Sequence, residues 1–541
     1  MRLIEIRDLD GPNLFLLQPA IKLELAADAR DRTPEAVARL AARLAPLGIS
    51  DEERPPGVGA IGALGLAAAA ALHARAGQPI PEMMWTELET PGHLVLAFGW
   101  EHRRFALALA QLLADVMIGA PIDLVGADQL GGLITADDLA DRPHLLRNVD
   151  RNRPIIAVTG TNGKTTTTRL IAHMLRGVGR RVGWTTTAGV YIEGELVLAG
   201  DYTGPSGAWR VFDEPHLDVA VLETARGGIL LRGLAYESND ISVFTNVAGD
   251  HLGLLGVHSV DGLARVKATV VSVTRPSGYA VLNADDLHSR GLAHTVHASH
   301  FWVSQRADHP AILAHVATGG RALVVRAGTI HQLWGRADQA VIEVSKIPIT
   351  FDGRAIHMIE NVLCAAAACF GFGLSRAEVV AGLTTFGTEP EHNPGRLQVY
   401  EVDGATVIID YAHNEPGLIY LLQFARGYLR PPGQLTAIIG TAGDRTNEAL
   451  FELGRIAAIQ ADRVIAKKTQ RYLRGRPSAA DMVPHYLAGV TAGGGKPCEV
   501  AAGELEALEL ALSRLSPGDV VAMMCQESGP AATERLTTRG R

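Results

Sequence analysis

The feature that most constrains this chain is a glycine- and threonine-rich turn between an apolar run and a helical pattern. Residues 155–158 are typical of a buried strand, Gly160-Thr161-Asn162-Gly163-Lys164-Thr165-Thr166 follows, and residues 166–175 have a helical pattern. Glycines let backbone N–H groups approach phosphate oxygens closely, and the start of a helix adds partial positive charge. We therefore predict a phosphate-binding loop, in which Lys164 contacts the β- and γ-phosphates of a nucleotide and Thr165 holds Mg²⁺.

The spacing of this loop departs from the usual pattern, which has four residues between its first glycine and the Gly-Lys pair. Here only Thr161 and Asn162 separate Gly160 from Gly163-Lys164. The alternative interpretation is an incidental turn before a helix. The strand that precedes the turn and the Lys-Thr-Thr run that follows favour the phosphate loop.

Composition excludes several classes of protein. The 541 residues are enough for about three domains, and 47% are hydrophobic, so a large core is expected. The net charge of -8 gives no basic surface for nucleic acid. The N-terminus lacks the apolar core of a secretory signal, and the apolar residues 61–72 are too few to span a membrane, so we expect a buried helix there. Four cysteines without a Cys-x-x-Cys pair indicate neither disulfides nor zinc, and we expect a cytoplasmic protein.

Alternating strand and helix patterns predict an α/β fold with parallel sheets. We expect a small α/β N-terminal domain (residues 1–145), a central ATP-binding domain with a phosphate loop on a parallel sheet (146–393), and a Rossmann-like C-terminal domain (394–541). Residues 137–154 read as a linker and residues 529–541 as a frayed polar tail. The predicted helices cover residues 34–47, 103–118 and 166–175. The predicted strands cover residues 2–7, 94–98, 155–158, 219–222, 242–246, 407–410, 435–439, 463–466 and 520–524.

A carboxylate follows one of these strands. Glu223 comes directly after the predicted strand 219–222. A carboxylate at a strand end opposite a phosphate loop is suited to bind Mg²⁺. The alternative is a glutamate that ends its strand in solvent.

The loop and Glu223 resemble the corresponding motifs of the Mur ligase superfamily, which includes the peptidoglycan stem-peptide ligases, folylpolyglutamate synthetase and the ligase half of cyanophycin synthetase. The resemblance implies that ATP binds at the loop and that Glu223 is a magnesium ligand. It also implies that His251 is a second magnesium ligand or lies close to one. Lys267 resembles the family lysine that becomes a carbamate and supports a second Mg²⁺. A structural histidine and a solvated helix lysine are the alternatives.

Further motifs follow in the family's order. Asn361, in His357-Met358-Ile359-Glu360-Asn361, resembles the asparagine that contacts adenine, although Met358 replaces the family's first asparagine. Arg396 resembles an arginine that approaches phosphate, and Asp410 an aspartate that binds the ribose hydroxyls.

Several segments look specifically like cyanophycin synthetase: Leu222–Leu230, Leu473–Arg476 and, near the N-terminus, Leu9–Asn13. That enzyme carries an ATP-grasp domain before its Mur-like part, and here no room exists for one between residue 145 and the loop. The chain is therefore expected to be half of such a polymerase, working with a separate ATP-grasp enzyme, or a ligase of different specificity. The N-terminal domain would hold a polymer, or serve in packing or oligomerisation. The basic run 467–472 replaces an acidic one and would suit a carboxylate-bearing substrate, or is a solvated loop.

These observations lead to one functional hypothesis. The chain is expected to be an ATP-dependent acid–amino-acid ligase, which converts a small-molecule or peptide carboxylate to an acyl phosphate, couples it to an amine, and releases ADP and phosphate. We expect a homo-oligomer with no nucleic-acid or membrane partner. The alternatives are a catalytically silent module that binds nucleotide and polymer, and a kinase that stops at phosphoryl transfer.

Overall fold

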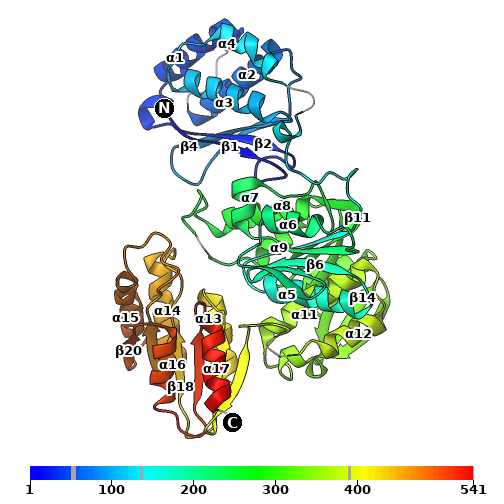
Figure 1. Cartoon of the computed structure of the whole chain (residues 1–541), viewed down its shortest axis with the longest axis vertical. Coiled ribbons are helices and arrows are strands. Elements are labelled where there is room, and N and C mark those ends of the chain that lie inside the picture. Colours follow the sequence, from blue (N-terminus) through cyan, green and yellow to red (C-terminus); the bar gives the residue numbers. More distant parts are fainter. Residues whose placement is uncertain (50–56, 135–137, 251, 388–390, 540–541) are drawn as a thin grey trace.

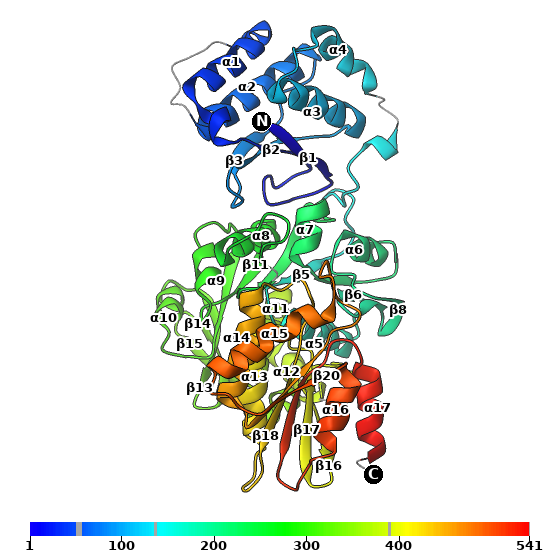
Figure 2. The same ribbon diagram turned by 90° about the vertical axis from the view of Figure 1, so that its left-hand side faces the viewer.

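The computed structural model describes residues 1–49, 57–134, 138–250, 252–387 and 391–539. In these residues the strands form three sheets of 4, 11 and 6 strands, which follow one another along the chain. Figures 1 and 2 show each sheet with its own helices, the first at one end of the molecule and the third at the other. We call the three parts the N-terminal, central and C-terminal domains.

The N-terminal domain is an antiparallel sheet covered by helices on one face (Figure 1). The strand order is β1–β2–β4–β3. Alternate residues of the inner strands, such as Leu23 and Leu96, are buried against the helices, as the period of two in a strand requires. The strands are β1 (Arg2–Leu9), β2 (Ala20–Ala26), β3 (Met83–Glu87) and β4 (His93–Gly99). The helices are α1 (Pro34–Leu44), α2 (Val58–Arg75), α3 (Arg103–Ile118) and α4 (Leu124–Gln129).

Helix α2 confirms the buried helix expected over residues 61–72. By length and composition alone it could cross a membrane, but 56% of its apolar window is buried inside the protein. Ile61, Leu64 and Leu72 are at most 2% exposed and pack in the domain core. An apolar helix with this burial is the core helix of the domain.

The central domain contains a parallel sheet extended by antiparallel strands at both edges. The order is β15–β14–β13–β12–β11–β10–β5–β9–β6–β7–β8, and the strands from β13 to β6 in this order are parallel. The strands are β5 (Ile155–Thr159), β6 (Val182–Thr186), β7 (Gly189–Ile192), β8 (Glu195–Ala199), β9 (Val219–Glu223), β10 (Asn239–Phe244), β11 (Thr274–Asn283), β12 (Ser299–Ser304), β13 (Arg321–Arg326), β14 (Thr329–Trp334) and β15 (Ala337–Glu343).

Helices cover both faces of this sheet, which explains why its strands are apolar without alternation. Ile156 and Val158 of β5 face α5, α11 and α12, whereas Ile155 and Ala157 face the opposite layer with α6, α7 and α8. The helices are α5 (Lys164–Gly177), α6 (Pro205–Phe212), α7 (Arg226–Arg232), α8 (Val260–Ser272), α9 (Leu287–Leu292), α10 (Pro310–Ala317), α11 (Ile356–Phe372) and α12 (Arg376–Thr385).

The C-terminal domain has the strand order β16–β17–β21–β18–β19–β20, parallel except for the edge strand β16. This confirms the α/β, Rossmann-like class. The strands are β16 (Gln398–Val402), β17 (Ala405–Asp410), β18 (Leu435–Ile439), β19 (Arg463–Lys467), β20 (Cys498–Ala501) and β21 (Val520–Met524). The helices are α13 (Glu415–Arg426), α14 (Asn447–Gln460), α15 (Val483–Ala492), α16 (Glu504–Leu512) and α17 (Gly529–Arg539).

The prediction of a frayed tail after residue 529 is wrong for the described residues, because they form helix α17. Ala532 and Leu536 are four residues apart, so they lie on one face of the helix. Both are at most 1% exposed and join the core beneath the last sheet. The hydroxyl groups of Tyr400 and Thr533, 2.9 Å apart, also link α17 to β16.

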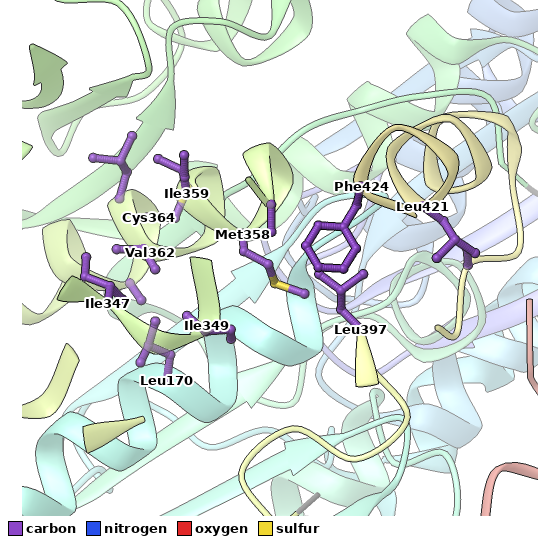
Figure 3. Close-up of a cluster of buried hydrophobic side chains, with 14 of the residues drawn as sticks. Leu170, Ile347, Ile349, Met358, Ile359, Val362, Cys364, Leu397, Leu421 and Phe424 are labelled. Carbon is purple, nitrogen blue, oxygen red and sulfur yellow. The ribbon is translucent and has the colours of Figure 1, made fainter. Parts of the chain in front are cut away.

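The apolar core of the central domain continues into the C-terminal domain. Met358 of α11 lies beside Leu397 and Phe424 in Figure 3, and all three belong to one buried cluster. The rings of Phe351 and Phe424, from the two domains, make an edge contact with centroids 4.9 Å apart. The two domains are therefore packed against each other through apolar side chains.

Candidate functional site

The segment 160–163 forms the predicted loop between β5 and α5, and two of its glycines have conformations that other residues rarely adopt. Gly160 has φ 145° and Gly163 has φ 85°. A Cβ atom at Gly160 would lie 1.9 Å from Oγ1 of Thr245, and one at Gly163 would lie 2.1 Å from Oδ1 of Asn361. Glycine is therefore required at both positions for backbone conformation and for space.

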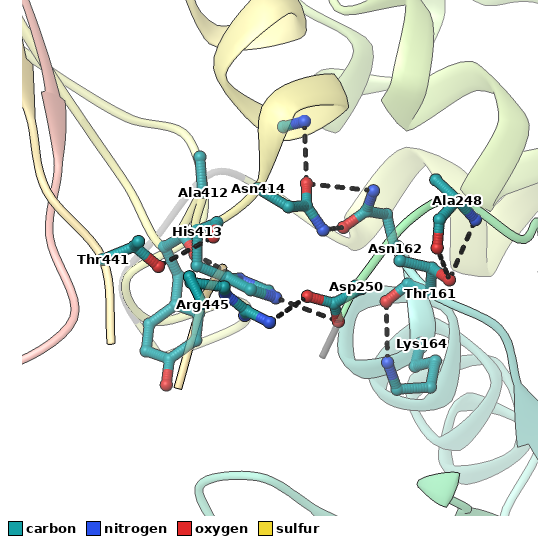
Figure 4. Close-up of polar contacts among 12 residues, drawn as sticks. Thr161, Asn162, Lys164, Ala248, Asp250, Ala412, His413, Asn414, Thr441 and Arg445 are labelled. Carbon is teal, nitrogen blue, oxygen red and sulfur yellow. Dashed lines mark hydrogen bonds and ion pairs between the residues drawn. The ribbon is translucent and has the colours of Figure 1, made fainter. Parts of the chain in front are cut away.

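The loop is fixed by its neighbours in the central domain (Figure 4). The Thr161 hydroxyl accepts the N–H of Ala248 at 3.1 Å and donates to the carbonyl of the same residue at 3.2 Å. The N–H of Thr161 donates to the carbonyl of Asn246, and the N–H of Asn162 donates to Oδ1 of Asn246. Lys164 donates to the carbonyl of Thr161 at 2.8 Å, so its ammonium group lies over the loop.

Thr165 and Glu223 lie together beneath the loop. The Thr165 hydroxyl donates to Oε2 of Glu223 at 2.9 Å, and Glu223 is only 2% exposed. The other oxygen, Oε1, has no hydrogen-bond partner among the residues that the structure describes. Burial raises the pKa of Glu223, although the charges of Lys164 and Arg396 oppose the shift. A buried carboxylate oxygen without a partner is suited to bind a cation.

Lys267, on α8, reaches the same site from below the loop. Its ammonium group donates to the carbonyl of Gly160 at 2.5 Å, and the residue is 4% exposed. Burial, together with the nearby charge of Lys164, lowers the pKa of Lys267 well below its ordinary value. The solvated lysine that was the alternative at this position is therefore excluded.

The C-terminal domain closes the other side of the cavity. The guanidinium group of Arg396 lies 4.3 Å from the ring centroid of Tyr411, and its Nη2 is 3.4 Å from the Thr165 hydroxyl. The side-chain amides of Asn162 and Asn414 face each other, at 3.0 and 3.4 Å (Figure 4). Residues of both domains therefore meet directly at the phosphate loop.

A second cavity adjoins the first at the loop and is suited to a nucleoside. It is lined by Asn361 and His357 from α11, by Asp410 at the end of β17 and by Tyr420 from α13. The two oxygens of Asp410 accept the N–H groups of Leu397 and Ala412, both at 2.7 Å. These bonds hold the carboxylate in place and leave acceptor capacity for hydroxyl groups.

The structure brings most of the predicted site residues together. The main cavity is lined by Thr161, Asn162, Gly163, Lys164, Thr165, Thr166, Glu223, Lys267 and Arg396. Gly160 contacts this group through its carbonyl, and Asn361 and Asp410 line the adjoining cavity. His251 lies outside the described residues, so its predicted role has no structural test here.

Several further cavity residues, among them Thr187, Asp201 and Gln526, were missed in the sequence. Thr187 directly follows β6, so its position after a parallel strand was the available signal. Asp201 and Gln526 belong to loops whose approach to the cavity depends on the packing of distant segments. Among the described residues, no three His, Cys, Asp or Glu side chains form a metal cage. Mg²⁺, which keeps several waters and phosphate ligands, does not require one.

The basic run 467–472 does not present all its charges to the cavity. Lys467 is 1% exposed and forms a 2.6 Å ion pair with Glu504, so it is not available to a substrate. Tyr472 and Arg474 do line the cavity, as does Arg445, which forms a 2.6 Å ion pair with Asp250. Arg474 likewise forms a 2.9 Å ion pair with Asp444, so an anionic group at this wall would share both arginines with their carboxylate partners.

A phosphate loop on a parallel sheet, opposed across a cavity by a Rossmann-like domain, defines a class of two-domain nucleotide-binding enzymes. The family model described as Mur ligase middle domain matches residues 158–369, and the model described as Mur ligase, glutamate ligase domain matches residues 395–526. The chain belongs to the Mur ligase family.

Relatives and solved structures agree with this assignment. Cyanophycin synthetase of Synechocystis sp. is 40% identical over 388 residues, which are 71% of this chain and 44% of that enzyme. The UDP-N-acetylmuramoyl-L-alanyl-D-glutamate–2,6-diaminopimelate ligase of Geobacillus kaustophilus is 28% identical, over 77% of this chain and 81% of that enzyme. The structure of Escherichia coli FolC in complex with ADP, at 19% identity, covers 71% of this chain and 90% of its own with a TM-score of 0.52, and shares the fold. The chain thus spans less than half the length of the cyanophycin synthetases it matches.

Proposed function

We propose that this protein is an ATP-dependent ligase that joins a carboxylate to an amine through an acyl phosphate. The observation that carries the proposal is the arrangement of Lys164, Thr165 and Glu223 under the loop, with Arg396 of the second domain facing them. Positive charge there would neutralise a bound triphosphate, and Oε1 of Glu223, which has no partner among the described residues, would be free to bind its metal. The named relatives are ligases, which supports the same reaction class.

The residues present fit a magnesium ion. Thr165 and Glu223 supply a hydroxyl and a carboxylate oxygen 2.9 Å apart, and no described residue bonds Oε1 of Glu223. We propose these two residues as the protein ligands of Mg²⁺, with His251 close by. Bound there, the ion would neutralise charge on the β- and γ-phosphates.

In the first step, an oxygen of the carboxylate substrate attacks the γ-phosphorus of ATP. The bond from that phosphorus to the β–γ bridging oxygen breaks, and ADP leaves. Lys164 and Arg396 are placed to stabilise the transferred group, whose charge lies on its equatorial oxygens. Asn361 would contact the adenine and Asp410 the ribose hydroxyls in the adjoining cavity.

In the second step, the amine attacks the acyl carbon, and the tetrahedral intermediate releases phosphate as the amide forms. The amine loses one proton, to phosphate or to solvent. Water would hydrolyse the acyl phosphate, so closure of the two domains around it protects the intermediate. The paired amides of Asn162 and Asn414 are a contact that such closure would retain.

We further propose that Lys267 carries a carbamate during turnover. Its buried amine has a lowered pKa, and only a neutral amine adds to CO₂, forming an N–C bond with loss of one proton. The product is an anion in place of a cation, which suits a position close to a second Mg²⁺.

The lining of the main cavity also suggests which substrates the protein uses. We propose an amino acid or other amine bearing a carboxylate, which Arg445 and Arg474 would bind. We also propose that the acid is made available by a separate ATP-grasp enzyme, since the described residues between helix α4 and strand β5 are too few to form such a domain. A cytoplasmic location, where ATP is available, is part of this proposal.

The test is a phosphate-release screen of paired acids and amines with MgATP. We expect release that requires both substrates and is abolished by Lys164→Ala, whereas Lys346→Ala, at an exposed lysine, keeps activity. Hydroxylamine should trap the acyl group when the amine is omitted. Nucleotide binding without substrate-dependent phosphate release would favour the silent module, and phosphorylated product without amide would favour a kinase.

A further inference from the structure

The N-terminal domain contacts the central domain at the ends of two helices, α7 and α8. These helices follow strands β9 and β10, which lead into the candidate site. One contact is made by the loop after β1, and the other by the hairpin between β3 and β4. The first reaches the C-terminal end of α7, which follows the strand bearing Glu223. The second reaches the N-terminal end of α8, which bears Lys267.

Glu89, in the hairpin, is the centre of the second contact. Its carboxylate accepts the N–H groups of His258 at 2.6 Å and Ser259 at 2.8 Å, and the Ser259 hydroxyl. Arg265, on the second turn of α8, donates to the same carboxylate at 3.0 Å. Although burial alone would raise the pKa of Glu89, the bonds from Ser259 and His258 and the charge of Arg265 lower it. The carboxylate therefore stays charged where it caps the helix.

The start of α8 is built to receive this carboxylate. Ser259 is the N-cap residue, and its hydroxyl also accepts the N–H of Gly262 at 2.9 Å. A Cβ atom at Gly262 would lie 2.3 Å from Oε1 of Glu89, so any larger residue would displace this carboxylate from the helix end. Thr90 adds a 2.8 Å hydrogen bond to the ring of His258. These bonds fix the helix end from outside the central domain.

The loop after β1 makes a backbone contact that also requires glycine. Asp10 donates its N–H to the carbonyl of Arg232, and the carbonyl of Pro12 accepts the N–H of Leu234, both at 2.8 Å. A Cβ atom at Gly11 would lie 1.9 Å from the carbonyl oxygen of Leu234. The segment Leu9–Asn13, singled out in the sequence, is thus a docking loop.

We propose that Glu89 is a positioning residue for the site, which holds α8 so that Lys267 meets the phosphate loop. The path is short: Glu89 bonds Ser259 at the helix start, and Lys267, two turns further on, donates to the carbonyl of Gly160. The N-terminal domain therefore supports the chemistry mechanically, whatever else it binds. The inference rests on the proposed function for its kinetic readout alone.

The test compares Glu89→Ala, Glu89→Gln and the control Glu87→Ala in the full chain, because Glu87 is exposed on the same hairpin. In Glu89→Ala we expect amide hydrogen exchange in residues 258–267 to rise while residues 356–372 stay unchanged. We expect amine-reactive labelling of Lys267, read by mass spectrometry, to rise at least severalfold. The Gln variant keeps an acceptor oxygen and should lie between wild type and Glu89→Ala.

With an active substrate pair, kcat of Glu89→Ala should fall about tenfold while KM for ATP stays within about twofold. A purely structural role would instead lower the melting temperature and leave kcat unchanged. Labelling and exchange equal to wild type would overturn the inference. Absence of turnover in the wild type would refute the proposed function alone, because labelling and exchange need no reaction.

Discussion

At the scale of single residues, the site concentrates buried ionisable groups for which burial outweighs the neighbouring opposite charges. Among the described residues, Oε1 of Glu223 has no hydrogen-bond partner, and the buried amine of Lys267 donates to the carbonyl oxygen of Gly160. Both have pKa values shifted toward the neutral form by burial. Such groups lower stability in the empty protein, and they are retained where a ligand of opposite charge binds.

Glu360 provides a pH test at this scale. Burial, with Asp286 and Asp285 nearby, raises its pKa to about 7, although a hydrogen bond from Asn246 opposes the shift. The unfolded chain loses this proton first, so stability should fall as pH rises from about 4.5 to about 7, by roughly 3 kcal/mol. Urea unfolding between pH 5 and 8 should show the fall in wild type and its loss in Glu360→Gln. Parallel pH profiles for the two proteins would contradict the prediction, and Glu195→Gln, at an exposed glutamate, is the control.

Sequence reasoning anticipated the site residues that sit in local motifs. The phosphate loop needs only one strand, one turn and one helix, so Gly160 to Thr166 could be placed without tertiary information. Asn361 and Arg396 were predicted from a family resemblance. Gln526 could not be found, because it reaches the cavity through a buried network with Lys467 and Glu504 that no sequence spacing encodes.

At the scale of elements, the bounds of helices and strands could be predicted where an apolar pattern begins and ends sharply in the sequence. Arg103–Ile118, Leu435–Ile439 and Val520–Met524 have the predicted bounds, since each is a continuous buried run or a clear helical face. The strand predicted at 242–246 lies at Asn239–Phe244 instead, because its polar first residues pair with β11 and the residues after Phe244 form the site loop. Helix α17 was missed because only two apolar residues anchor it.

The buried ion pair of Lys467 and Glu504 gives a prediction about protein stability, because Glu504 also holds the segment that follows β21. Both side chains are 0% exposed, and Glu504 also accepts the N–H groups of Gln526, Glu527 and Ser528. Lys467→Met leaves a buried carboxylate without its cation and should cost about 3–5 kcal/mol in urea unfolding. Adding Glu504→Gln should recover part of this loss. Lys346→Met, at an exposed lysine, should change stability by less than about 0.5 kcal/mol.

At the scale of the whole molecule, the two cavities at the phosphate loop are bounded by two domains that share one apolar core. A bound ligand would add contacts across a boundary that is already packed by Met358 and Phe424. Binding and global stability should therefore be coupled.

A thermal-shift experiment tests this coupling. A non-hydrolysable ATP analogue with Mg²⁺, at 100 times its Kd, should stabilise the protein by about 2.7 kcal/mol. Glu223→Gln should remove the magnesium-dependent part of the shift, while its melting temperature without ligand is unchanged or higher because a buried charge is gone. Lys164→Ala should bind at least about tenfold more weakly, a loss of about 1.4 kcal/mol. An equal shift in wild type and Glu223→Gln would exclude this residue as a ligand of the metal.

The path of the chain between the N-terminal and central domains shows where an extra domain could be inserted. Leu146 pairs with the backbone of Ala235 and Glu237, and Val149, just beyond, is 82% exposed. The docking contacts at Gly11 and Glu89 lie elsewhere, so they do not depend on this crossing being short. An inserted loop or domain at Val149 would therefore extend into solvent. The N-terminal and central domains would keep their contacts at Gly11 and Glu89.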